Sequence, residues 1–139
     1  INNNQKEILV LGRNNKDITK YIDKTYKQDD DMYTFNNISF RYLTIHKSKG
    51  LESNTVILIN MENSSLGMPT KIKDEKILKY VNNTKDIYPY EEERRLLYVA
   101  LTRTKNKTYI ISPTKNESIF ITEIKKDKSN ILQIKNRLQ

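Results

Sequence analysis

The sequence has no cysteine and a single histidine, His46, among its 139 residues. Without cysteine the chain can form no disulfide, no thiolate zinc site and no cysteine nucleophile, and one histidine cannot build a multi-histidine metal site. We therefore expect the chain to hold no metal ion of its own.

Long apolar runs are also missing. No segment approaches the length that is needed to cross a bilayer, and the first residues lack the basic-then-apolar order of a signal peptide. The length suits one compact domain with a buried core. We expect a soluble, cytoplasmic protein without a membrane partner, and we expect the isolated chain to be monomeric.

Positive charge is abundant. The 25 lysine and arginine residues against 17 acidic residues give a formal net charge of +8, which favours polyanionic partners through phosphate contacts and counterion release. However, 19 of the basic residues are lysine and 16 residues are asparagine, a bias that AT-rich coding also produces. Charge alone leaves nucleic-acid binding open, so the motifs have to decide it.

Short apolar segments alternate with helical patterns along the chain. Residues 7–11 and 55–59 are apolar runs typical of buried strands, residues 38–44 alternate apolar and polar side chains as a strand does, and residues 109–111 form another short strand ended by Pro113. We expect residues 55–59 to lie at the centre of the sheet. Strands that alternate with helices predict an α/β domain with a parallel sheet.

Three helices are predicted between these strands. Their ranges are residues 17–26 with Asp17 as the cap, residues 90–104, and residues 114–124 with Thr114 and Glu117 at capping-box spacing. Residues 62–88 form a long excursion with at most one short helix, near residues 74–80. The lysine-rich tail, residues 125–139, is either a marginal amphipathic helix or disordered.

Two segments concentrate polar residues beside apolar ones, and the first is residues 44–52, Thr-Ile-His-Lys-Ser-Lys-Gly-Leu-Glu. It forms a compact turn between two strands, in which Gly50 permits a positive φ or a close backbone approach. Thr44 and His46 would lie beyond the carboxyl end of a strand, where open parallel sheets bind ligands. The turn therefore suits recognition of a phosphate or a sugar.

The second segment is residues 91–103, Glu-Glu-Glu-Arg-Arg-Leu-Leu-Tyr-Val-Ala-Leu-Thr-Arg, on the second helix. Glu91 and Glu92 are at helical neighbour spacing to Arg95, which indicates surface ion pairs. Arg103 emerges at the end of a mostly apolar helix, so its guanidinium leaves a buried surface at a defined point. Arg103 either satisfies the last carbonyls of the helix or carries a function.

Residues 44–52, followed by an apolar strand, resemble helicase motif V, and residues 91–103 resemble motif VI, of the UvrD/Rep-type superfamily 1 DNA helicases. The motifs stand in the family's order, and residues 66–74 and 88–90 look closest to the helicase IV branch. Two long motifs with consistent spacing are far more specific than a lone glycine pattern. The resemblance implies a RecA-like, P-loop NTPase-type parallel sheet flanked by helices over residues 1–124, followed by a basic tail, residues 125–139.

In this family ATP lies between two RecA-like domains, and the resemblance implies roles for individual residues. Arg103 matches the arginine finger that reaches the γ-phosphate, a role suited to a permanently charged fork. Glu52 matches the acid that contacts the ribose, and Gly50 would let the backbone approach the nucleotide. The alternative for Glu52 is an ordinary surface carboxylate.

Other positions match the DNA side of the family. Thr44, His46 and Lys47 resemble the part of motif V that couples the nucleotide state to the DNA backbone, although a structural hydrogen bond explains His46 nearly as well. Arg13 and Asn14 lie in a segment, residues 8–15, that resembles motif IVa, whose polar end faces single-stranded DNA.

The phosphate-binding loop G-x-x-x-x-G-K-[ST] is absent, because none of the three glycines, Gly12, Gly50 and Gly67, precedes lysine and a hydroxyl residue. The magnesium-holding acid of the first motor domain has no counterpart either. The resemblance thus implies that ATP and Mg²⁺ are bound mainly by an N-terminal RecA-like domain, and that this chain alone does not hydrolyse ATP. An excised domain and a natural remnant both fit these features.

The sequence therefore predicts the second motor domain of an ATP-dependent 3′–5′ DNA helicase that moves on single-stranded DNA. One alternative is a helicase-like module that acts by binding RNA polymerase or another protein, since such modules share motifs V and VI. Another is a generic basic α/β domain, whose affinity for nucleic acid would fall steeply with salt and would not depend on Arg103 or Glu52.

Overall fold

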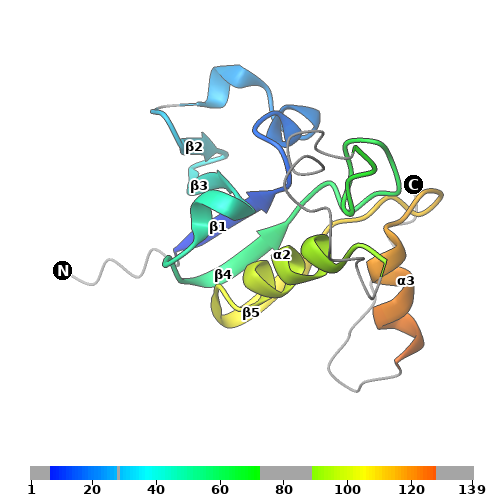
Figure 1. Cartoon of the computed structure of the whole chain (residues 1–139). Coiled ribbons are helices and arrows are strands. Elements are labelled where there is room, and N and C mark those ends of the chain that lie inside the picture. The colour runs from blue at the N-terminus through cyan, green and yellow to red at the C-terminus, as the bar shows by residue number, and fades with distance from the viewer. Residues whose placement is uncertain (1–6, 28, 73–88, 128–139) are drawn as a thin grey trace, which may run out of the picture.

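A computed structural model of the chain describes residues 7–27, 29–72 and 89–127. They form a five-stranded sheet of order β2-β3-β1-β4-β5, flanked by helices (Figure 1), so the predicted α/β class is confirmed. The strands are β1 (Ile8–Gly12), β2 (Met32–Phe35), β3 (Ile38–Thr44), β4 (Ser53–Leu58) and β5 (Thr104–Ile110). The helices are α2 (Glu91–Leu101) and α3 (Ile119–Lys126), with 3-10 turns η1 (Asp17–Lys20), η2 (Lys24–Tyr26) and η3 (Ile45–Ser48).

Four of the five strands are parallel, and β2 alone pairs antiparallel, with β3. The apolar runs 7–11 and 55–59 lie on β1 and β4 in the interior of the sheet, where helices and turns cover both faces, whereas the segment 109–111 lies at the end of the edge strand β5, with Tyr109 and Ile111 exposed. Strand β1, rather than the predicted 55–59 segment, is the middle strand, because β3 and β4 pair on either side of it. Strand β4 is its inner neighbour.

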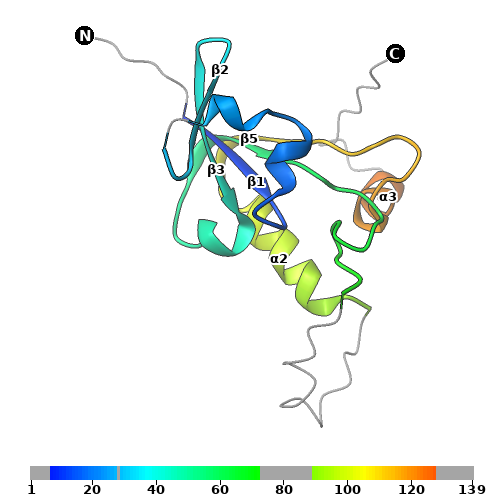
Figure 2. The same cartoon turned by 90° about the horizontal axis from the view of Figure 1, so that it is seen from above.

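The sheet has a core on each face. Helices α2 and α3 lie on one face and the η1–η2 segment on the other (Figures 1 and 2). Alternate side chains of β1 divide between the two cores, since successive residues of a strand point to opposite faces. The core under the α-helices includes Leu9, Leu11, Ile45, Val56, Leu58, Leu96, Ala100 and Phe120. The opposite core includes Val10, Ile18, Tyr33, Phe40, Tyr42 and Ile59.

The predicted first helix, residues 17–26, is not continuous. The chain forms the short turns η1 and η2 instead. Aspartate side chains bond to nearby backbone amides and so compete with the helix: Asp17 accepts from the Asn14 amide at 2.9 Å and Asp23 accepts from the Thr25 amide at 3.0 Å. The second of these bonds lies in the middle of the predicted helix and ends it.

Strand β2 was not predicted from the sequence. It pairs with β3 across a two-residue turn, Asn36-Asn37, in which both residues have positive φ, 48° and 62°. Asparagine tolerates this region, and such turns match the twist of a hairpin. The two asparagines between apolar segments were a usable signal for the hairpin.

Helix boundaries account for the remaining differences. Helix α2 ends at Leu101 rather than near residue 104, and β5 begins at Thr104, well before the predicted strand 109–111. Helix α3 begins after Ser118, whose hydroxyl accepts from the Phe120 amide at 3.2 Å, so the predicted start at Thr114 is wrong. The predicted helix 74–80 and most of the tail, from residue 128, lie outside the described residues.

Candidate functional site

The residues predicted to act together lie at two opposite edges of the sheet. Residues of the first group lie at or just after the carboxyl ends of β1 and β3, which are in register at Gly12 and Thr44. Residues of the second group flank the amino ends of β4 and β5, which are in register at Ser53 and Thr104. The carboxyl-edge group comprises Arg13, Asn14, Thr44, His46 and Lys47, and the amino-edge group comprises Gly50, Glu52 and Arg103.

A single segment joins the two edges. After β3 ends at Thr44, the chain makes η3, turns at Gly50 with φ of +85°, and enters β4 at Ser53. Turn η3 packs against the sheet under α2, where Ile45 is 1% exposed. The motif V-like residues therefore span one face of the sheet and reach both edges.

The carboxyl edge is hollowed. A concavity of about 680 Å³ is bounded by the loop after β1 and by η3. Thr44 is buried and caps η3 by accepting from the Lys47 amide at 3.4 Å, while His46 and Lys47 are exposed. The concavity is also lined by Lys16 and Lys20. Lys20 is paired with Glu62, and Asp17 also lines the hollow. Lys16 and Lys47 remain as cations that suit a phosphodiester backbone.

Hydrogen bonds hold the loop after β1 in place. The hydroxyl of Tyr42 donates to the Asn14 carbonyl at 2.6 Å, and the Asn14 side-chain amide donates to the Leu66 carbonyl at 2.7 Å. Burial, reinforced by the charge of Asp17, raises the pKa of Tyr42 well above its ordinary value. Tyr42 is therefore a neutral donor at physiological pH, and the loop has a defined shape.

Arg13 lies on the rim of this concavity, but its guanidinium contacts the protein. Arg13 Nε donates to both carboxylate oxygens of Glu93, at 3.0 and 3.1 Å, and Nη2 donates to Oε1 at 2.9 Å. The Thr70 amide donates to Oε2 of the same carboxylate at 3.1 Å. The side chains of Arg13 and Glu93 are only 21% and 10% exposed, so this is a largely desolvated, bidentate ion pair.

At the amino edge, Arg103 lies between the end of α2 and the motif V-like segment. Its Nε donates to the Val99 carbonyl at 3.1 Å and Nη1 donates to the Leu51 carbonyl at 3.3 Å. Among the described residues no carboxylate is within ion-pair distance of it. The helix-capping alternative thus describes the contact of Arg103 with Val99, and a second bond joins the guanidinium to the carbonyl of Leu51, the residue before Glu52.

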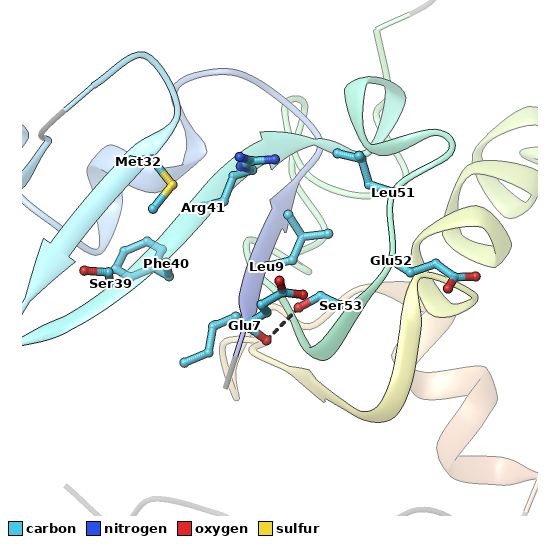
Figure 3. A pocket seen from close by; sticks show the side chains of 10 residues that line it. Glu7, Leu9, Met32, Ser39, Phe40, Arg41, Leu51, Glu52 and Ser53 are labelled. Carbon is cyan, nitrogen blue, oxygen red and sulfur yellow. Dashed lines mark hydrogen bonds between the residues drawn. The ribbon is translucent and has the colours of Figure 1, made fainter. Parts of the chain in front are cut away.

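Glu52 is exposed, and its carboxylate is 3.8 Å from Lys105 Nζ. It stands at the border of a second hollow, of about 330 Å³, whose other walls come from β1, β2 and β3. Figure 3 shows Glu52 pointing away from the other labelled side chains, while Ser53 donates to the Glu7 carbonyl at 2.6 Å. The Gly50 backbone is open, since an added Cβ would meet nothing within 4 Å. Backbone and carboxylate are both accessible to a ligand at this edge.

Sequence reasoning missed the role of Glu93. The predicted pairs of Arg95 with Glu91 and Glu92 are present, at 2.6 and 3.7 Å, but Glu93 differs from these two because it is 8% exposed. A signal existed: Glu93 is three, four and seven residues before the buried Leu96, Leu97 and Ala100, and so lies on the apolar face of the helix. A carboxylate at such a position needs a partner.

Arg94 joins helix α2 to helix α3. Its guanidinium donates to both oxygens of Glu123 on α3, at 2.6 and 2.9 Å, and lies 5.0 Å from the centroid of the Phe120 ring. The Glu123 hydrogen bond raises the pKa of Arg94, and the same bond lowers the pKa of Glu123. Helix α2 is thus attached to β1 through Glu93 and to α3 through Arg94.

Within residues 7–27, 29–72 and 89–127, no three histidine, aspartate or glutamate side chains gather as a metal site would require. In the same part of the chain, none of the helices has both the length and the apolar character of a membrane span.

The relatives that this chain matches include DNA helicases. The chain is 32% identical over 84 residues to DNA helicase IV of Escherichia coli, an alignment that covers 60% of this chain and 12% of the relative. It is 35% identical over 85 residues to the ATP-dependent DNA helicase PcrA of Staphylococcus epidermidis, covering 61% of this chain and 10% of the relative.

The chain thus spans only about a tenth of the length of these curated relatives. The family model for the UvrD-like helicase C-terminal domain matches residues 5–115. That range includes all five strands and α2, and with them both segments that resemble helicase motifs. The chain belongs to the UvrD-like helicase C-terminal domain family.

Proposed function

We propose that this chain is the second motor domain of an ATP-dependent 3′–5′ DNA helicase, with a nucleotide site at its amino edge and a single-stranded DNA site at its carboxyl edge. One observation carries the proposal: Arg103 of the motif VI-like segment, just after α2, donates to the carbonyl of Leu51, the residue before Glu52 in the motif V-like segment. Two segments that are far apart in sequence thus bring a cation and a carboxylate to one exposed edge.

Arg103 is suited to neutralise charge on a transferring phosphoryl group, because arginine stays protonated and presents several donors in a fixed plane. The carbonyls of Val99 and Leu51 hold the side chain at the edge without neutralising it. In the proposed mechanism, the guanidinium exchanges the Leu51 carbonyl for a phosphate oxygen when the nucleotide-bearing domain closes against this edge. Glu52 then accepts from a ribose hydroxyl.

The amino-edge group does not suit Mg²⁺, which prefers several oxygen ligands in octahedral geometry, since Glu52 is its one carboxylate and no three histidine, aspartate or glutamate side chains gather among the described residues. We assign Mg²⁺ and the phosphate-binding loop to an N-terminal RecA-like domain that packs against this edge. This chain then contributes the second wall of the nucleotide site, and alone it is expected not to turn over ATP.

At the carboxyl edge, we assign the exposed His46 and Lys47, together with Asn14, to contacts with the backbone of single-stranded DNA. Thr44 shapes the turn that presents them, through its bond to the Lys47 amide. Such contacts would be insensitive to base sequence, because phosphates carry none. Their position at the far end of the 44–52 segment from Glu52 supports coupling between nucleotide and DNA.

The test is ATP turnover by a complete protein that carries this domain, at saturating ATP and single-stranded DNA. Arg103→Ala is expected to lower turnover on the order of a thousandfold or more, as loss of an arginine finger does. Arg95→Ala is the matched control, since Arg95 belongs to the same motif VI-like segment and its side chain is 69% exposed. Unchanged turnover in Arg103→Ala would refute the finger assignment, and robust turnover by the pure 139-residue chain would refute the division of labour.

A further inference from the structure

The ion pair between Arg13 and Glu93 joins the carboxyl edge of the sheet to helix α2, whose other end lies near the amino edge. Arg13 directly follows β1 at the carboxyl edge, and Glu93 lies in the first turn of α2. Arg103 follows the other end of α2, which ends at Leu101, about 12 Å beyond Glu93 at the rise of an α-helix. The pair therefore attaches the start of the helix to the DNA-side rim, while the end of the helix holds the arginine of the nucleotide side.

We propose that Glu93, held by Arg13 and the Thr70 amide, is a positioning residue that links the carboxyl-edge concavity to Arg103 through helix α2. This inference rests on the proposed function and deepens it, because it states how occupancy of one edge would alter the other. Neither Arg13 nor Glu93 is assigned a contact with substrate in this mechanism.

Three features favour a link over a purely stabilising contact. A buried ion pair contributes little net stability compared with apolar residues of similar volume, so stability alone gives little reason for one here. The pair joins residues that are 80 positions apart, whereas Glu91 and Glu92 pair only within their own helix. The Glu93 carboxylate also holds the loop that follows β4, through Thr70, which makes it the meeting point of three segments.

The bidentate geometry fixes the orientation of the Arg13 guanidinium relative to the Glu93 carboxylate. A planar guanidinium with two parallel bonds resists rotation about the contact, which a single ammonium–carboxylate contact does not. A displacement of Arg13 would therefore be transmitted to the first turn of α2. Because the helix hydrogen bonds keep α2 rigid over its 11 residues, a displacement of its start moves Arg103 relative to Leu51.

The experiment compares ATP turnover with and without single-stranded oligothymidine in the complete protein. Glu93→Gln keeps the shape and an acceptor for Thr70 but removes the charge, and Arg13→Lys keeps the charge but removes the fork. Each is expected to lower the ratio of DNA-stimulated to basal turnover about fivefold or more, the size of a typical coupling. Glu92→Gln, which removes an exposed carboxylate of the same helix, is expected to keep the wild-type ratio.

The combined variant, Arg13→Lys with Glu93→Gln, is expected to lose no more than the more impaired single variant, because both changes break one link. A folded Glu93→Gln protein with the wild-type ratio overturns the inference, as does an equal loss in Glu92→Gln. A further outcome is that wild-type turnover requires both DNA and Arg103 while the Glu93→Gln variant keeps the full stimulation by DNA. That result refutes the positioning role of Glu93 and leaves the proposed function intact. If the wild type shows no DNA-dependent turnover, the proposed function itself fails.

A measurement on the wild type covers the case in which these variants do not fold. Amide hydrogen exchange is followed with and without oligothymidine, and the Thr70 amide reports on Glu93 directly. DNA is expected to slow exchange at Thr70 and in the first turn of α2 as well as in the loops of the carboxyl edge. Protection confined to residues 13–20 and 44–48 overturns the link.

Discussion

The hydroxyl of Tyr42 on β3 donates a 2.6 Å hydrogen bond to the carbonyl of Asn14, in the loop that leaves β1. This contact is possible because residue 12, beneath it, is glycine. A Cβ at Gly12 would overlap the Tyr42 hydroxyl and approach Asp17 to 3.0 Å. The shape of the carboxyl edge therefore depends on the absence of a Cβ at residue 12.

Gly12→Ala is expected to destabilise the domain by about 1–3 kcal/mol, the usual cost of overpacking a tight site. Tyr42→Phe alone is expected to cost about 1 kcal/mol, because the Asn14 carbonyl loses its donor. The double variant removes the clashing atom and should be more stable than Gly12→Ala alone. Urea unfolding of the three variants measures this, and strictly additive losses would contradict the steric explanation.

The Ser118 cap of α3 is a second test of local structure. Ser118 is fully buried; its hydroxyl accepts from the Phe120 amide and donates to the Met68 carbonyl. Ser118→Ala is expected to cost about 1–2 kcal/mol through the lost cap and the unpaired carbonyl. Thr114→Ala is the matched control and should change stability by less than about 0.5 kcal/mol. Equal losses in thermal unfolding would indicate that the helix begins at Thr114 after all.

The pair of Lys20 and Glu62 predicts a pH effect. Lys20 Nζ donates to Glu62 Oε1 at 2.7 Å, and this bond lowers the pKa of Glu62 more than partial burial raises it, with help from Ser64. A lowered folded-state pKa means that the contribution to stability is fully present above the ordinary glutamate pKa, about 4.3. It is lost as pH falls through the lower, folded value.

Glu62→Gln should remove this component of the acid dependence. Because the Lys20 side chain is 50% exposed, the difference from wild type should stay below about 1 kcal/mol at neutral pH, and it should shrink as pH falls below about 4.3. Urea unfolding between neutral and acidic pH gives both curves. Parallel curves at every pH would show that the pair does not contribute.

Much of the fold could be predicted because apolar patterns are local. The segments that became β1, β3, β4 and α2 were evident from runs of apolar residues and from helical spacing. Helix 17–26 failed because Asp23 bonds to an amide two residues ahead, a choice that spacing does not reveal. Hairpin β2–β3 was missed although its asparagine turn was visible.

The candidate site was predictable only in part, because the identity of its residues is local but their contacts are not. The motif-like segments indicated Glu52 and Arg103, whereas the partner of Arg13 lies 80 residues away and could not be inferred. The contact of Arg103 with Leu51 likewise depends on the parallel pairing of β4 with β5. The pairing of distant strands decides which charged side chains come into contact, and the sequence of a single segment does not reveal that pairing.

The assigned DNA edge predicts a specific dependence on salt. Each phosphate contact of a lysine with single-stranded DNA adds about 0.7 to the slope of log affinity against log salt concentration, through release of a counterion. If Lys47 contacts a phosphate, Lys47→Ala should weaken binding of single-stranded oligonucleotides similarly for every base sequence and reduce that slope by about 0.7. Lys107→Ala is the control, because Lys107 is exposed on β5, an edge strand separated from β3 by β1 and β4. Fluorescence anisotropy over a series of salt concentrations measures both slopes.

An equal reduction in the two variants would indicate attraction by the net charge of the chain, whereas a reduction in Lys47→Ala alone requires a phosphate at the turn after β3.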